Sequence, residues 1–154
     1  MGNLKGSTRA YEEALNLARE HGETAHEATA LASLSVVYRD LGCFKAALSC
    51  GREALRLLRK SGDLQAEAYV LSSLAESHRK LGHYPSALLC LRRSLRLRRK
   101  VGDKEGEIGV LYDLARIYEN LGDTDRGRAC SEEAVLRNGM LEQSKLALGA
   151  KRRN

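Results

Sequence analysis

The chain contains 154 residues, of which 43% are hydrophobic and 30% are charged, with one Pro, no Trp and a formal net charge of +6. This composition supports a buried core, excludes a disordered chain and favours helix. No run approaches the roughly 20 apolar residues of a membrane span, and the first residues lack the apolar core of a secretory signal, so we expect no membrane span and a cytoplasmic location.

A pattern of constant length repeats along the chain. Its first copy consists of Leu31, Leu34, Tyr38, Leu41-Gly42, Ala47 and Leu55. It recurs 40 residues further on, from Leu71 to Leu95, and again from Leu111 to Val135, without insertion or deletion. A fixed period of this length is typical of a stacked array of small units. It divides the chain into residues 1–22, 23–62, 63–102, 103–138 and 139–154.

Residues 1–22 match only the second half of the pattern. Shifting by one period places Gly2 at the position of Gly42, and Gly22 at the position of Gly62. The segment is therefore predicted to be a half-repeat, the second helix of a pair whose first helix is missing, with the inward face of residues 7–18 uncovered. We expect that the sequence is a segment or short isoform of a longer array, or that a partner supplies the missing helix.

Residues 23–62 are predicted to form the first complete helix pair. The apolar residues of its first half lie three or four apart, as on one face of a helix: Leu31, Leu34, Tyr38 and Leu41. Gly42 is expected to end this helix, because Gly readily adopts the left-handed conformation of a helix terminus. A second helix is expected from about Phe44 to Arg59, and Asp63 is expected to cap the helix that follows the turn.

Residues 63–102 and 103–138 are predicted to be two further pairs, followed by a cap and tail at residues 139–154. Pro85 falls in the first turn of its helix, where a missing N–H is tolerated. Gly127 and Arg128 replace the Ala and Leu of the earlier copies, so the last helix should bury less. A short separate capping helix is predicted within residues 140–150 from its three leucines, Leu141, Leu146 and Leu148. The last four residues are expected to be disordered.

Three of the four cysteines, Cys50, Cys90 and Cys130, hold the same place in successive units. Helix axes pack about 8–10 Å apart, whereas a disulfide requires Cα atoms within about 7 Å. The same separation excludes a zinc ion shared between them. We expect free thiols that act as small hydrophobic residues in a reducing compartment, and no metal ion.

The basic residues are concentrated in residues 92–100 and 151–153. This distribution is interpreted as a solvated helix face in preference to a nucleic-acid site, and binding of RNA or an anionic membrane through residues 92–100 ranks below the protein-binding hypotheses.

No catalytic constellation is found in the sequence. The four histidines lack a Cys, Ser or carboxylate at a spacing with mechanistic meaning: His21, His26, His78 and His83. There is no Gly-rich phosphate loop, because the glycines belong to helix ends. We therefore predict that the chain is not an enzyme, takes no small-molecule substrate and needs no cofactor.

The order of Leu34, Ser35, Tyr38, Leu41-Gly42, Ala47 and Ala54, repeated three times, resembles the tetratricopeptide repeat over about residues 1–138. This resemblance implies an all-α fold, a right-handed α-solenoid of stacked antiparallel helix pairs, here with about seven helices. The period of 40 exceeds the usual 34 and resembles the subtype found in the Pins/LGN adaptors and in rapsyn. The family implies a scaffold that holds a partner, often a peptide, in a concave groove.

Helix geometry locates this groove. At roughly 100° per residue, positions 29, 32, 36, 39 and 40 lie opposite Leu34 and should face the concave side, with their counterparts in the later units. The predicted partner-binding residues are Val36, Arg39, Tyr69, Ser72, Glu76, Arg79, Tyr112, Arg116 and Glu119. Tyr69 and Tyr112 among arginines have the composition of an interface hot spot, or equally rest against a neighbouring helix.

Two subtypes of the family do not fit. Chaperone-binding members clamp a terminal carboxylate with Lys and Asn, but the matching positions hold Ala32, Val36, Ser73, Gly109 and Asp113. The paired Asn of the Pins/LGN type are also absent, so its ligand set is not transferred.

The leading hypothesis is a protein–protein interaction scaffold that binds a partner peptide segment in the concave groove. The alternative is a structural or regulatory spacer within a larger protein, which self-associates through residues 7–18 of the incomplete first repeat.

Overall fold

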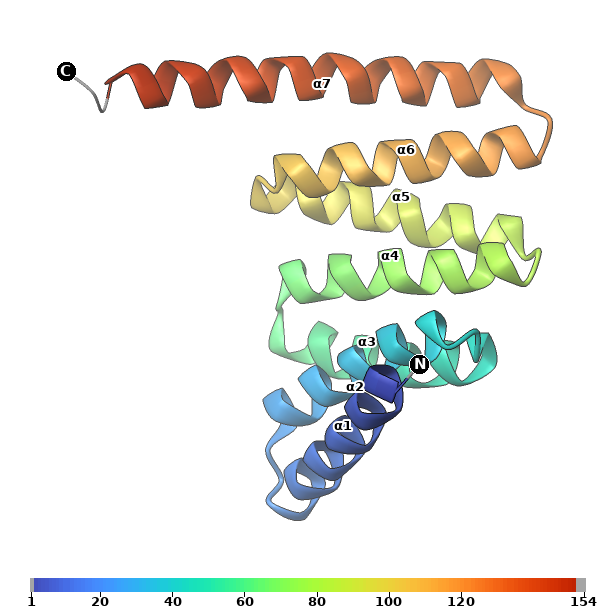
Figure 1. Cartoon of the computed structure of the whole chain (residues 1–154), viewed down its shortest axis with the longest axis vertical. Coiled ribbons are helices and arrows are strands. Elements are labelled where there is room, and N and C mark those ends of the chain that lie inside the picture. The colour runs from blue at the N-terminus through green and yellow to red at the C-terminus, as the bar shows by residue number, and fades with distance from the viewer. Residues whose placement is uncertain (1, 152–154) are drawn as a thin grey trace.

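The computed structural model describes residues 2–151, with side chains for residues 6–145. The described residues form seven α-helices and no strand (Figure 1): α1 (Gly2–Glu20), α2 (Thr24–Asp40), α3 (Phe44–Ser61), α4 (Leu64–Lys80), α5 (Tyr84–Val101), α6 (Lys104–Asn120) and α7 (Thr124–Lys151). Each helix packs against the next, and α2 also contacts α4. The predicted all-α solenoid of stacked helix pairs is confirmed.

Glycine ends the helices at regular intervals. Six glycines adopt positive φ between 68° and 77°, one in each turn: Gly22, Gly42, Gly62, Gly82, Gly102 and Gly122. The turn that leads into α4 carries the cap that the sequence predicts, because Asp63 accepts a hydrogen bond from the Ala66 N–H at 2.9 Å. Asp103 caps α6 in the same way and accepts one from the Gly106 N–H at 2.9 Å. Pro85 stands in the first turn of α5, as predicted.

The core runs along the array between the paired helices. Leu31, Leu34, Leu71, Leu74 and Leu111 are almost fully buried. Small residues let α3 approach its neighbours: a Cβ added to Gly51 would lie 2.5 Å from Cδ2 of Leu74. Ala47 and Ala54 on the same helix are completely buried.

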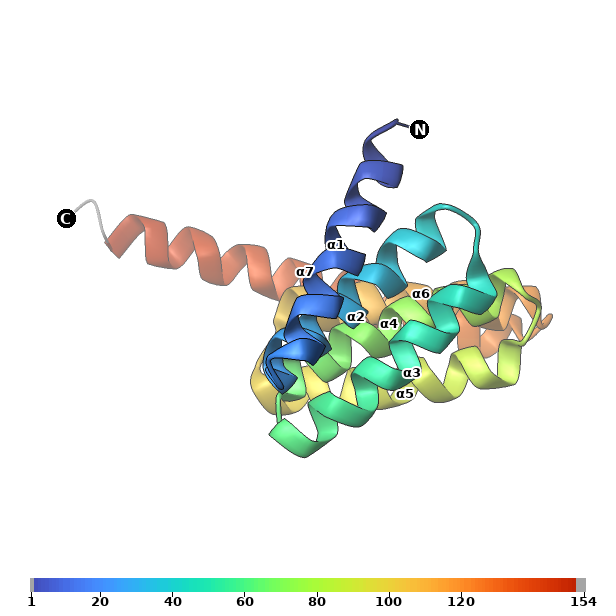
Figure 2. The same ribbon diagram turned by 90° about the horizontal axis from the view of Figure 1, so that it is seen from below.

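One face of α1 is uncovered. Leu15 and Ala18 are buried, but Leu17 is 56% exposed, whereas Leu57, its counterpart in α3, is 5% exposed. No helix precedes α1 in the described residues, so nothing covers the side chains that α2 covers in α3. The N-terminal part of α1 and the C-terminal part of α7 both project from the body of the array (Figure 2).

The prediction of a separate capping helix after Gly139 is wrong, because α7 continues without a break from Thr124 to Lys151. A glycine inside a helix costs about 1 kcal/mol. Contacts on both sides offset this cost: Arg137 pairs with Glu107 and Glu133, and Leu141 packs against the core beneath. The side chains of Leu146 and Leu148 and the tail residues 152–154, expected to be disordered, lie outside the described part of the chain.

Candidate partner-binding groove

The first part of the groove is an apolar hollow of about 780 Å³ over the first helix pair. Val36 and Val37 of α2, Leu57 and Leu58 of α3 and the ring of Tyr69 on α4 contribute to its lining. Tyr11 of α1 closes one side. Because Tyr69 is 53% exposed, an incoming side chain has access to both the hollow and the tyrosine ring.

The second part is a smaller hollow of about 200 Å³ at the middle of the array. Its lining comes from α2, α4, α5 and α6: Arg39, Tyr69, Ser72, Ser73, Glu76, Arg98, Asp113 and Arg116. Tyr69 lines both hollows, so the two form one continuous surface that is apolar at one end and polar at the other.

Every arginine in and beside the central hollow has its own carboxylate. Arg39 donates to Asp40 at 2.7 Å, and Arg79 donates two hydrogen bonds, of 2.7 and 2.6 Å, to Glu76. Arg98 pairs with Asp103 and Arg116 with Asp113. The groove is therefore rich in charge but close to neutral.

These pairs shift the pKa values of two carboxyl groups in opposite directions. The hydrogen bonds from Arg79 lower the pKa of Glu76, whereas burial raises the pKa of Asp113 despite the opposing effect of Arg116. Asp113 is thus the acidic group in the hollow whose charge is held least firmly. A donor from a bound partner would stabilise its ionised form.

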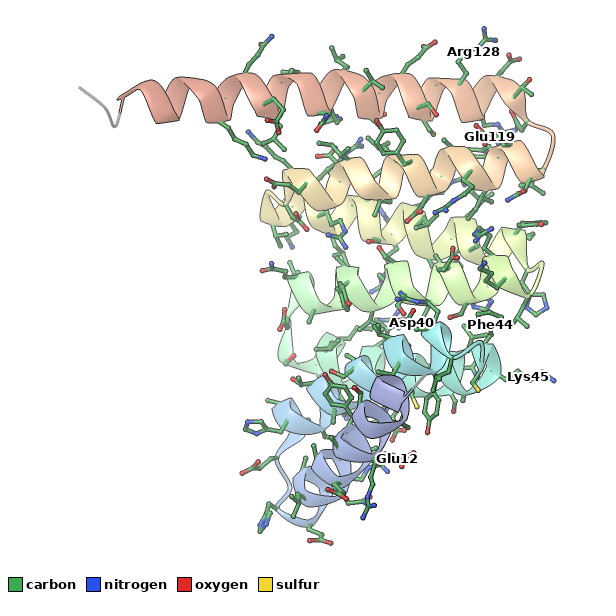
Figure 3. All side chains as sticks on the ribbon, in the orientation of Figure 1. Glu12, Asp40, Phe44, Lys45, Glu119 and Arg128 are labelled. Atoms are coloured by element: carbon green, nitrogen blue, oxygen red, sulfur yellow. The ribbon has the colours of Figure 1, made fainter. Side chains whose placement is uncertain are left out.

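The structure brings together six of the nine predicted groove residues. Five line the central hollow, namely Arg39, Tyr69, Ser72, Glu76 and Arg116, and Val36 lines the apolar hollow. Arg79 lies next to them through its bonds to Glu76. Tyr112 and Glu119 do not line either hollow; Glu119 lies near the C-terminal end of α6 (Figure 3).

Sequence reasoning missed Arg98, Tyr11 and the leucines of α3. Arg98 belongs to the basic run that was interpreted as a solvated face, yet it lines the central hollow and its Nε donates to Ser94 at 3.3 Å. The sequence does contain a signal for Arg98. Ser94 corresponds to the buried Ala54, and Arg98, four residues later, lies on the same face of the helix. Tyr11 has no such signal, since its counterpart Gly51 is packed against Leu74.

The residues that the structure describes contain no group of His, Cys, Asp and Glu placed to hold a metal ion. Cys50, Cys90 and Cys130 are half-buried free thiols, and burial raises the pKa of each. No helix in the described range is long and apolar enough to span a bilayer.

Family comparisons match most of the chain. Two models described as tetratricopeptide repeat match residues 26–100 and 108–139. A third, described as anaphase-promoting complex subunit 5, matches residues 1–34. No curated protein sequence matches significantly.

Two solved structures share the architecture. The chain superposes on BtubC (BKLC) from P. vanneervenii with a TM-score of 0.85 and 21% identity, covering 92% of this chain and 59% of BtubC. It superposes on the MamA protein with a TM-score of 0.60 and 18% identity, covering 90% of this chain and 75% of MamA. The chain thus spans little more than half the length of BtubC. At these identities the likeness concerns the fold alone.

Proposed function

Because the chain belongs to the tetratricopeptide repeat family, we propose that it is a non-enzymatic scaffold whose concave groove binds a peptide segment of a partner protein. The observation that carries this proposal is the continuity of the apolar and central hollows through Tyr69. A peptide that crosses it places an apolar side chain in one hollow and its polar groups in the other.

Two kinds of interaction support this use of the groove. Burial of one aliphatic or aromatic side chain in the apolar hollow is worth about 1.5–3 kcal/mol. The central hollow offers hydroxyl and guanidinium groups beside carboxylates, which match the alternating donors and acceptors of a peptide backbone better than a uniformly charged ligand. Tyr69 is the expected hot spot, since exposed tyrosines at the centre of interfaces often dominate binding.

The experiment is a selection from a displayed peptide library on the purified chain, with affinities measured for Tyr69→Ala and Tyr112→Ala. Tyr112 is a matched control, because it is a half-exposed tyrosine on α6 that lines neither hollow. We expect Tyr69→Ala to weaken binding about tenfold or more and Tyr112→Ala to have a small effect. Equal affinities for wild type and Tyr69→Ala would refute the groove as the binding surface.

Self-association through α1 is the second candidate, supported by the exposure of Leu17 on its uncovered face. A self-associating chain would form dimers whose mass depends on concentration and which Leu17→Glu dissociates. A scaffold with a free groove would sediment at the monomer mass of 17.0 kDa. A cytoplasmic location belongs to the same proposal, and the four free cysteines support it.

A further inference from the structure

The arginines of this chain divide into two groups. Within residues 6–145, every arginine forms an ion pair with a carboxylate except Arg52, Arg56, Arg92 and Arg96. All four are exposed, and one of them, Arg92, donates a hydrogen bond to the Tyr118 hydroxyl, at 2.7 Å. We call these four residues the arginine square.

The square lies on the outer face of two helices, α3 and α5, that belong to successive units. Arg52 and Arg56 are four residues apart on α3, and Arg92 and Arg96 are their counterparts one period later on α5. Both helices reach the same carboxylate of α4, because Arg59 of α3 and Arg93 of α5 each pair with Oε1 of Glu67, at 3.1 and 2.6 Å. Figure 2 shows α3 and α5 on the same side of the array. Residues 52 and 56 point away from the buried side of α3, which carries Ala47, Ala54 and Leu58.

The arginine square lowers the stability of the two helices. Arginines four residues apart repel each other along a helix, and no carboxylate offsets the repulsion in either row. Lys60 and Lys100, both exposed, extend the two rows by one turn. Such a cost is typical of a surface kept for a ligand rather than for stability.

The arginines of the square have no counterparts on α1 or on α7, the outer helices that precede and follow α3 and α5. The positions of Arg52 and Arg92 are occupied by Glu12 on α1, labelled in Figure 3, and by Glu132 on α7, and both glutamates are exposed. A long polyanion or a bilayer laid along the outer face would meet these carboxylates. A short anionic segment confined to α3 and α5 would not.

We infer that the arginine square is a second interaction surface, separate from the groove, which binds a short acidic segment of a partner protein. Guanidinium groups bind carboxylates through paired hydrogen bonds, and the four unpaired arginines offer such donors. Leu89 lies on the same face of α5, three residues before Arg92, and is 72% exposed. This isolated apolar contact suits a protein segment better than a phosphate backbone.

The test uses the full chain and labelled peptides of Glu or of Gln. The rows from Arg52 to Lys60 span roughly 12 Å, so peptides of about ten residues cover both. Arg56→Gln/Arg96→Gln removes one arginine from each row and leaves Arg92 bonded to Tyr118. Arg9→Gln/Arg128→Gln removes the same charge from exposed arginines elsewhere and is the matched control.

The Glu peptide should bind the wild type, more weakly as salt rises, and the Gln peptide should not. The square variant should bind about tenfold more weakly, and the control should stay within about twofold of wild type. Tyr69→Ala should leave this binding unchanged, which separates it from the groove. The melting temperature of the square variant should equal or exceed that of the wild type.

Four results would overturn the inference. Absence of binding by the Glu peptide would mean that the square does not bind an acidic segment. Equal losses in both double variants would mean that only net charge acts. Tighter binding of a single-stranded RNA or of phosphatidylserine vesicles through Arg56 and Arg96 would assign the square to another class of partner. A lowered melting temperature in the square variant would show that the arginines stabilise the fold.

Discussion

His78 occupies a position that holds tyrosine in the other two complete units. The Tyr38 hydroxyl donates to Glu12 and the Tyr118 hydroxyl accepts from Arg92, each at 2.7 Å. Nδ1 of His78 is buried without a partner in the described structure, and the ring lies near Arg52 and 5.9 Å from His83. Burial first, then the charges of His83 and Arg52, lower the pKa of His78.

This lowered pKa predicts acid sensitivity. Above pH 6.5, the pKa of histidine in the unfolded chain, the side chain is neutral in both the folded and the unfolded state. As the pH falls below 6.5, the unfolded chain takes up the proton first, so the free energy of unfolding declines until the pH reaches the lower pKa of the folded state. We expect His78→Tyr to weaken this dependence and, by removing an unpaired buried nitrogen, to raise stability at pH 7 by about 1 kcal/mol. Urea unfolding between pH 5 and 7.5, roughly the range where histidine titrates, measures both effects.

The exposed His26 supplies the control for that experiment, because its substitution by Gln removes an imidazole from the surface without changing a buried side chain. If His78→Tyr and wild type lose stability in parallel below pH 6.5, the acid sensitivity arises elsewhere.

Buried glutamates join one helix pair to the next. Glu67 is 3% exposed and accepts from Arg59 and Arg93, and Glu107 accepts from Arg99 and Arg137 at 2.6 and 2.9 Å. The half-buried Glu27 accepts from Arg19 at 3.0 Å in the same way. The junction thus repeats with the same period as the core, and it recurs at Glu27, Glu67 and Glu107.

We expect Glu67→Gln to lower the free energy of unfolding by about 2 kcal/mol. Breaking a buried ion pair costs about 3–5 kcal/mol, and the partial exposure of Arg59 and Arg93 reduces this figure. Glu105→Gln alters an exposed glutamate and should change stability by less than about 0.5 kcal/mol. Urea unfolding followed by circular dichroism compares the two; equal midpoints would show that the junction contributes little.

The sequence predicts helix faces well and contacts between charges poorly. Periodicity marks residues such as Leu34 and Val36 as facing opposite sides, because the angle per residue is constant. It does not reveal that Arg59 meets Glu67, since the intervening turn sets their separation. The sequence predicts a separate helix within residues 140–150, but only long-range contacts, through Arg137 and Leu141, decide that α7 continues past Gly139. The unit boundaries and the Pins/LGN and rapsyn subtype stay predictions.

The whole molecule has no single centre, because each helix packs mainly against its sequence neighbours. Stability in such an array is approximately a sum of local terms, and the ends are covered on one side only. The exposed Leu17 on α1 and the exposed Val135 on α7 mark these ends.

We therefore expect graded hydrogen exchange. Amides of α4, which packs against α2, α3 and α5, should exchange slowest. Those of the first turns of α1 and of α7 beyond Leu141 should exchange faster by about two orders of magnitude or more, since they open with little loss of burial. Mass spectrometry of the exchanged peptides measures this difference in exchange rate between helices. Uniform protection from α1 to α7 would mean one cooperative unit.

The repeated junction also makes the length of the array adjustable by duplication. Residues 63–102 begin with the acceptor Glu67 and end with the donor Arg99, so two copies in tandem would join by the pairing that Arg59 and Arg99 already make. An inserted copy would need no new interface. It would lengthen the concave groove by one helix and add a third pair of arginines to the outer face, so a crossover in the gene changes the reach of both surfaces in one step.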